Sequence, residues 1–133
     1  MRLLGADGWN DPGLVQVGEA FVEGAIFVDG FFAASPSPLV RDFVAAFQAR
    51  YHEPPDLLAA QAYDTLRLCV QALKSGARSR AQLRDALLQI RDFPGVSGHT
   101  TIDPQGDAIK ELYVLTVQQG TLVQLSPPVL ATD

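Results

Sequence analysis

The side chains that could carry out chemistry are few and widely separated in this sequence. His52 and His99 have no cysteine, histidine or carboxylate at the spacing that metal sites use. Residues 95–99 include a serine between glycines, but a nucleophile elbow needs a glycine where His99 stands. The sequence therefore indicates no metal site and no catalytic residue, and we expect neither a cofactor nor an enzyme activity.

An acidic turn near the C-terminal end superficially matches a calcium loop. Asp103, Gln105 and Asp107 alternate as calcium ligands do. Gly106, however, lies between them, whereas a calcium loop has its glycine after the third ligand. The pattern favours a β-turn with solvated carboxylates.

Asp7 lies in a turn between two glycines, directly after the apolar residues 2–4. Its negative charge would repel a phosphate, so this turn does not predict a phosphate loop. Strand ends in α/β proteins commonly carry ligand contacts, and a carboxylate there can pair with a cationic ligand group. Two interpretations follow from the residues alone: Asp7 is an acid that faces a ligand, or it is a solvated turn residue or helix cap.

The composition describes a folded protein with no affinity for nucleic acid or anionic membranes. Of the 133 residues, 47% are hydrophobic and 19% are charged, which is typical of one globular domain. The formal net charge of −5 disfavours contacts with phosphates. No apolar run reaches the roughly 20 residues of a membrane span. The first residues do not match a secretory signal, so we expect any export signal to come from elsewhere.

The pattern of apolar residues predicts an α/β fold with three main helices packed on a small mixed sheet. Helical spacing of apolar residues over 38–51 and 56–74 predicts two of these helices, and a capping-box pattern at residues 79–82 begins the third. We expect the helix over 56–74 to be central, with Tyr63 and Leu66 buried. Strands are predicted at residues 2–4, 24–32, 97–102, 112–117 and 121–125.

Several short phrases, in this order, resemble the C-terminal portion of type I periplasmic binding proteins, especially the group for branched-chain amino acids and amides. They are LGADGW at 4–9, EGAIFV at 23–28, VRDF at 40–43, PD at 55–56, AAQAYD at 59–64, FPGVSG at 93–98 and IDPQGD at 102–107. Each phrase alone is weak, but together they extend over nearly the whole chain.

The resemblance implies part of a fold in which two α/β lobes close on a ligand about a hinge. It places residues 1–24 at the end of the second lobe and residues 25–95 in the first lobe, after a hinge crossing. Residues 96–133 would supply the returning hinge strands. Phe27, Val28 and Asp29 are the hinge residues that it implies, all within one segment of 133 residues that would form a single domain.

For function, the resemblance implies a non-catalytic segment of an ABC importer that binds a small molecule, either an amino acid or an amide. Asp7 corresponds to the acid that receives the ammonium group of the ligand, and Leu58 corresponds to an apolar ligand contact. A membrane permease would be the partner of the parent protein. The compartment implied is the periplasm, with the cytoplasm as the alternative.

Two other functions stay open. The chain could be a cytosolic ligand-sensing or regulatory module of the same fold, or an oligomerising segment that binds no ligand of its own. We expect self-association, because the apolar strands over 24–32 and 112–117 would lack their normal partners in an incomplete receptor. Exchange of a strand or helix between identical copies is one way to cover them.

Overall fold

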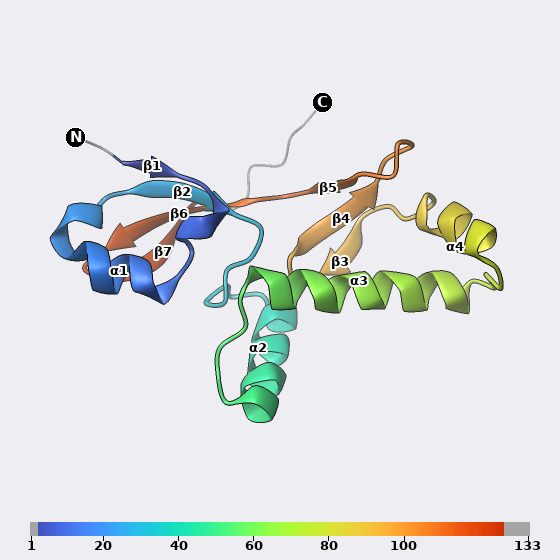
Figure 1. Cartoon of the computed structure of the whole chain (residues 1–133), viewed down its shortest axis with the longest axis horizontal. Helices are drawn as coiled ribbons and strands as arrows, with labels where there is room; N and C mark the ends of the chain where they lie inside the picture. The colour runs from blue at the N-terminus through green and yellow to red at the C-terminus, as the bar shows by residue number, and fades with distance from the viewer. Residues whose placement is uncertain (1–2, 127–133) are drawn as a thin grey trace.

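The strands of the computed structural model, which describes residues 3–126, fall into two separate small sheets (Figure 1). The first sheet has the order β1-β2-β6-β7, and the second has the order β3-β4-β5. β1 and β2 are parallel and all other neighbours are antiparallel, so the first sheet is mixed. The expected α/β class is therefore confirmed.

The first sheet and the short helices beside it form what we call the sheet part. Its strands are β1 (Leu4–Gly5), β2 (Ile26–Asp29), β6 (Tyr113–Gln118) and β7 (Thr121–Ser126), and its helices are η1 (Asp7–Trp9), α1 (Pro12–Gly18) and η2 (Glu19–Val22). Because side chains alternate between the two faces of a strand, one face of β2 contributes to a core: Phe27 is buried while its neighbour Val28 faces outwards. Leu115 and Val117 on β6 complete the same core.

The helices α2 (Pro38–Tyr51), α3 (Leu57–Lys74) and α4 (Arg80–Leu87) form the helical part, together with β3 (Phe93–Gly95), β4 (Gly98–Ile102) and β5 (Ala108–Lys110). Local capping sets where helices begin. Asp56 accepts a hydrogen bond from the Ala59 amide at 2.8 Å, and Ser79 accepts one from the Gln82 amide at 3.2 Å. In Figure 1, α3 lies alongside the second sheet while α2 projects away from it.

The prediction that Tyr63 and Leu66 are buried is wrong. Leu66 is 65% exposed and Tyr63 is 42% exposed. The buried face of α3 consists instead of Ala60, Asp64, Leu68 and Ala72, at a strict spacing of four residues. Small alanines on that face allow the helix to approach the second sheet closely, and the wider apolar face is left uncovered by residues 3–126.

The strands that we expected to be unpaired are not sheet edges. β2 lies between β1 and β6, and β6 lies between β2 and β7, so both have hydrogen-bonded neighbours on each side. The edges of this sheet are β1 and β7. Strands 24–32 and 112–117 therefore do not offer free edges for association, whereas α3 carries exposed apolar side chains.

Two segments connect the sheet part to the helical part. The first crossing, residues 30–37, leads from β2 to α2, and the second crossing, residues 111–112, leads from β5 to β6. Because β2 pairs with β1, the chain leaves the sheet part after Asp29 and not at residue 25. Phe31 packs in the core of the helical part, whereas the next residue, Phe32, packs in the core of the sheet part. None of the helices in residues 3–126 is long and apolar enough to span a membrane.

Candidate functional site

Asp7 is exposed at the start of η1, immediately beyond β1. Its carboxylate accepts a local hydrogen bond from the Gly8 amide at 3.0 Å. The Trp9 side chain holds the loop against the core, where the centroid of its ring lies 6.3 Å from that of Phe27. Gly5 is needed for this packing, because a Cβ at that position would overlap the Trp9 ring. The loop thus presents Asp7 to solvent on a fixed support.

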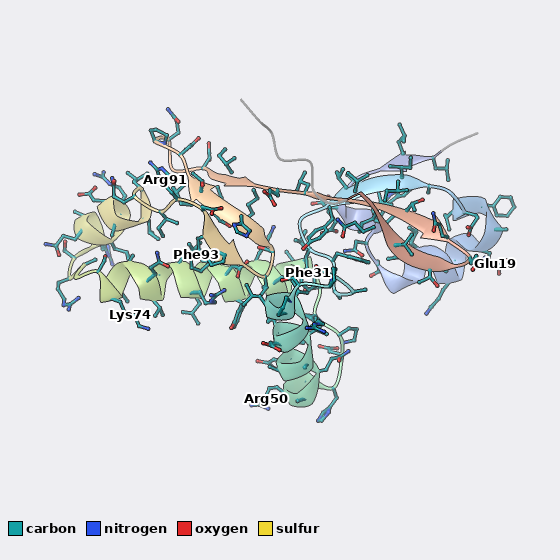
Figure 2. All side chains as sticks on the ribbon, turned by 180° about the vertical axis from the view of Figure 1, so that it is seen from behind. Glu19, Phe31, Arg50, Lys74, Arg91 and Phe93 are labelled. Atoms are coloured by element: carbon teal, nitrogen blue, oxygen red, sulfur yellow. The ribbon has the colours of Figure 1, made fainter. Side chains whose placement is uncertain are left out.

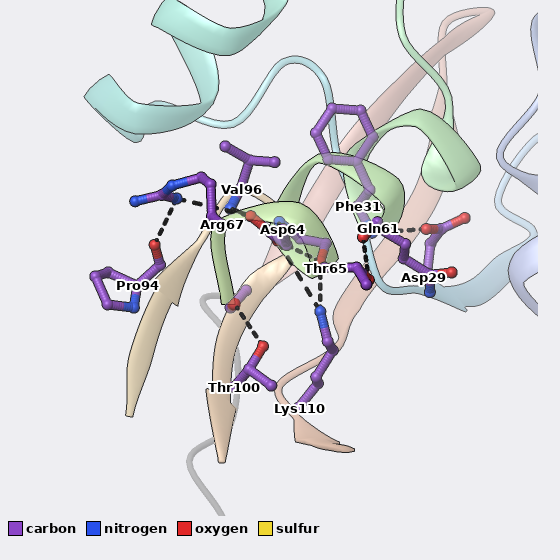
Figure 3. A network of polar contacts seen from close by, with 12 residues as sticks. Asp29, Phe31, Gln61, Asp64, Thr65, Arg67, Pro94, Val96, Thr100 and Lys110 are labelled. Carbon is purple, nitrogen blue, oxygen red and sulfur yellow. Dashed lines mark hydrogen bonds and ion pairs between the residues drawn. The ribbon is translucent and has the colours of Figure 1, made fainter. Parts of the chain in front are cut away.

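Asn10, Asp29 and Phe31 tie this loop to the first crossing. The Asn10 side chain donates to the Phe31 carbonyl at 2.7 Å, and the Phe31 amide donates to the Asp29 carboxylate at 2.7 Å. Figure 3 shows Asp29 beside Phe31. Burial raises the pKa of Asp29 and the nearby charge of Asp7 adds to this, while hydrogen bonds from Phe31, Asn10 and Gly30 oppose it. The loop that carries Asp7 is therefore joined to the first crossing through Asn10.

Leu58 follows directly after a residue of the helical part that lies near the same crossing. α3 begins at Leu57, and a Cβ on Gly30 would lie 3.2 Å from the Leu57 side chain. The next residue, Leu58, is 71% exposed. Asp7 and Leu58 thus lie on different parts of the molecule, and their neighbours Asn10 and Leu57 lie at residues 30–31.

A cavity of about 600 Å³ lies at the junction of the two parts. Its walls come from both crossings, the start of α2, and strands β3, β4, β6 and β7, and include Ser35, Leu39, His99, Leu112 and Tyr113. This volume is within the range of small-molecule sites. Neither Asp7 nor Leu58 lines it, so the cavity and the predicted site residues are separate features of the junction.

Sequence reasoning missed two polar side chains, Asn10 and Asp64, that form hydrogen bonds to residues distant in sequence. Asn10 gave no signal, because its partner is a backbone carbonyl 21 residues away in sequence. Asp64 did give a signal, because a carboxylate on an apolar helix face must find hydrogen-bond partners if that face is buried. Within residues 3–126, no three metal-ligating side chains come together.

The chain belongs to the periplasmic binding protein family, since the family model of that description matches residues 1–121. A solved protein from Rhodospirillum rubrum, assigned to a branched-chain amino acid ABC transporter, is 29% identical with a TM-score of 0.86, over 94% of this chain and 37% of that one. No curated protein sequence matches. The expected family and the partial type I fold are thereby confirmed.

Two further solved structures carry ligand names. The leucine-binding protein LivK from Thermotoga maritima is 30% identical with a TM-score of 0.77, over 94% of this chain and 36% of that one. LivJ from Streptococcus pneumoniae is a branched-chain amino acid transporter substrate-binding protein solved with isoleucine. It is 32% identical with a TM-score of 0.73, over 91% of this chain and 36% of that one. The chain therefore spans little more than a third of the length of these proteins.

Proposed function

We propose that this chain forms part of a receptor that captures an amino acid for an ABC importer, without catalysis. The observation that carries the proposal is the junction at residues 29–31, where Asn10 bonds the loop of Asp7 to the Phe31 carbonyl and where Leu57, the neighbour of Leu58, lies near Gly30. The similarity to a leucine-binding protein and to a protein solved with isoleucine, at 30% and 32% identity, supports the ligand class. A permease partner and a periplasmic location follow from the same family and are part of the proposal.

Each site residue has a distinct proposed role. Asp7 receives the ligand's ammonium group through a charge-assisted hydrogen bond, an interaction worth roughly 1.5–3 kcal/mol. Leu58 contacts the apolar side chain of the ligand. Phe27, Val28 and Asp29 form the strand from which the hinge leaves the sheet part. An amide ligand would use the same carboxylate as an acceptor.

The test is calorimetry on this chain produced together with the remainder of a receptor of this family, using leucine, isoleucine and an aliphatic amide. Asp7→Asn preserves shape and removes charge, so the affinity for leucine should fall about tenfold or more, equivalent to at least 1.4 kcal/mol. Glu53→Gln, at an exposed acid between α2 and α3, is the matched control and should not change affinity. Equal leucine affinity in Asp7→Asn and the unmodified protein would contradict the assignment.

A further inference from the structure

A buried carboxylate on α3, outside the candidate ligand site, is the centre of a polar network (Figure 3). Asp64 is 1% exposed. One of its oxygens accepts a hydrogen bond from the Val96 amide at 2.9 Å, and the other accepts bonds from the Ser97 amide at 2.8 Å and the Ser97 hydroxyl at 2.7 Å. Burying a carboxylate without partners costs several kcal/mol, so these bonds attach the β3–β4 turn firmly to α3.

The turn is shaped around this carboxylate. A Cβ on Gly95 would lie 2.5 Å from an Asp64 oxygen and 2.7 Å from the Gly98 carbonyl, so only glycine fits there. Gly98 has a φ of +91°, which glycine adopts without strain. Ser97 is fully buried and bonded to Asp64, and this excludes it as a nucleophile. The glycine-serine run at 95–98 therefore serves to enclose an acid.

Two cations complete the network from different elements. The Lys110 ammonium lies 2.5 Å from the Ser97 hydroxyl oxygen and 4.0 Å from an Asp64 oxygen. The Arg67 guanidinium lies 3.7 Å from the other Asp64 oxygen and donates to the Pro94 carbonyl at 3.0 Å. Burial lowers the pKa of Lys110, and the charge of Asp64 opposes that shift. Together the cations offset the negative charge inside the helical part.

Lys110 is placed where its fixation has a consequence for the whole molecule. It is the last residue of β5, where it pairs with Thr100. The next residue begins the second crossing, and its backbone passes close to Gly98: a Cβ there would lie 3.2 Å from the Glu111 carbonyl. β6 begins at Tyr113. The network therefore fixes the point at which the second crossing leaves the helical part.

We propose that Asp64, acting through Ser97 and Lys110, is a positioning residue that sets the angle between the helical part and the sheet part. The first crossing is held by Asp29, Asn10 and Phe31, which leaves the second crossing to define the rotation of one part relative to the other. This role is independent of the ligand and goes beyond the proposed function. Release of Lys110 should let the parts rotate while each stays folded.

The experiment measures distances between spin labels by pulsed electron paramagnetic resonance. Cys69, the single cysteine, is first changed to serine. Labels at Gln16→Cys on α1 and Gln48→Cys on α2 report the distance between the parts, and labels at Gln48→Cys and Arg84→Cys on α4 report a distance within the helical part. An excess of unlabelled chain removes signals between molecules.

Lys110→Met should broaden the distance distribution between the parts and leave the distribution within the helical part unchanged. Lys74→Met, at an exposed lysine of α3, is the control and should change neither. Ser97→Ala should act like Lys110→Met, and it serves as the second variant if Lys110→Met does not fold. An unchanged distribution between the parts in folded Lys110→Met would overturn the proposal. Equal broadening of both distances would also overturn it, because the network would then only stabilise the helical part.

Discussion

At the scale of single residues, Asp29 shows how burial can outweigh hydrogen bonding. The side chain is 1% exposed at the end of β2, and it accepts a bond from the Phe31 amide. Desolvation is nevertheless the largest influence, and it raises the pKa of Asp29 above the value of 3.8 that an unperturbed carboxyl has. The ionised form is therefore less favourable in the folded chain than in the unfolded chain.

This raised pKa predicts a pH-dependent effect of Asp29→Asn. At pH values between the pKa of Asp29 in the unfolded chain and its pKa in the folded chain, the folded state binds more protons. The stability that the protonated Asp29 carboxyl supplies is therefore present below the unfolded pKa, and it is lost as the pH rises through the folded pKa. Asparagine is uncharged at every pH and keeps an acceptor for Phe31. We expect Asp29→Asn to melt at a higher temperature than the unmodified chain at neutral pH, with the difference shrinking towards acid pH.

Thermal unfolding followed by circular dichroism, at pH values from acid to neutral, tests that prediction. Asp42→Asn, at an exposed acid of α2, is the control and should shift the melting temperature little at any pH. A melting temperature of Asp29→Asn that is lowered at neutral pH, and that approaches the value of the unmodified chain at acid pH, would instead show that the ionised carboxylate stabilises the fold.

Residue-level predictions from sequence could be made only where the information is local or comes from the family resemblance. The positions of Asp7 and Leu58 came from the family resemblance, and their roles remain proposals. Asn10 and Asp64 were missed because their partners, Phe31 and Ser97, are distant in sequence and meet them only after folding.

At the scale of elements, helix starts could be predicted and helix faces could not. Asp56 and Ser79 cap two of the predicted helices through their side chains, because a cap bonds to a residue three positions away, whereas α2 begins without a side-chain cap. α3 has apolar residues on two faces, so its sequence could not reveal which face meets the second sheet. β3 and β5 were missed because each has three residues, and β3 contains Pro94.

The corrected face of α3 gives a direct mutational test. Leu68 packs with Ile90 and Phe93 in a buried cluster, so Leu68→Ala should lower the free energy of unfolding by about 2–5 kcal/mol. Leu58→Ala, on the same helix but largely exposed, should cost about 0.5 kcal/mol or less. Urea titrations of both variants measure this. Equal losses at the two positions would contradict the assignment of the faces.

At the scale of the whole molecule, the uncovered side of the helical part favours self-association as a second candidate function. Leu66, Val70 and Leu73 form an exposed apolar stripe on α3, and Tyr51 on α2 is also exposed. Surfaces of this kind are commonly interaction sites. The hinge strands, which we had expected to mediate association, are paired on both sides.

We therefore expect the chain to form oligomers through α3. Light scattering should detect a dimer or larger species at high concentration, and Leu66→Lys should return it to the monomer by placing a charge in the stripe. Leu4→Lys, which charges an exposed leucine of β1 instead, should leave the oligomer intact. A monomer at every concentration, with no binding of a dye for apolar surfaces, would rule out this association.

The placement of Phe31 and Phe32 in opposite cores has a mechanical consequence. With a single peptide bond between two anchored rings, the first crossing cannot slide, so relative motion of the parts is rotation about a pivot at that bond. In such a rotation, the displacement of a residue grows with its distance from the pivot. Residues close to that bond would move little, whereas α1 and α4, at the two far ends in Figure 1, would travel furthest.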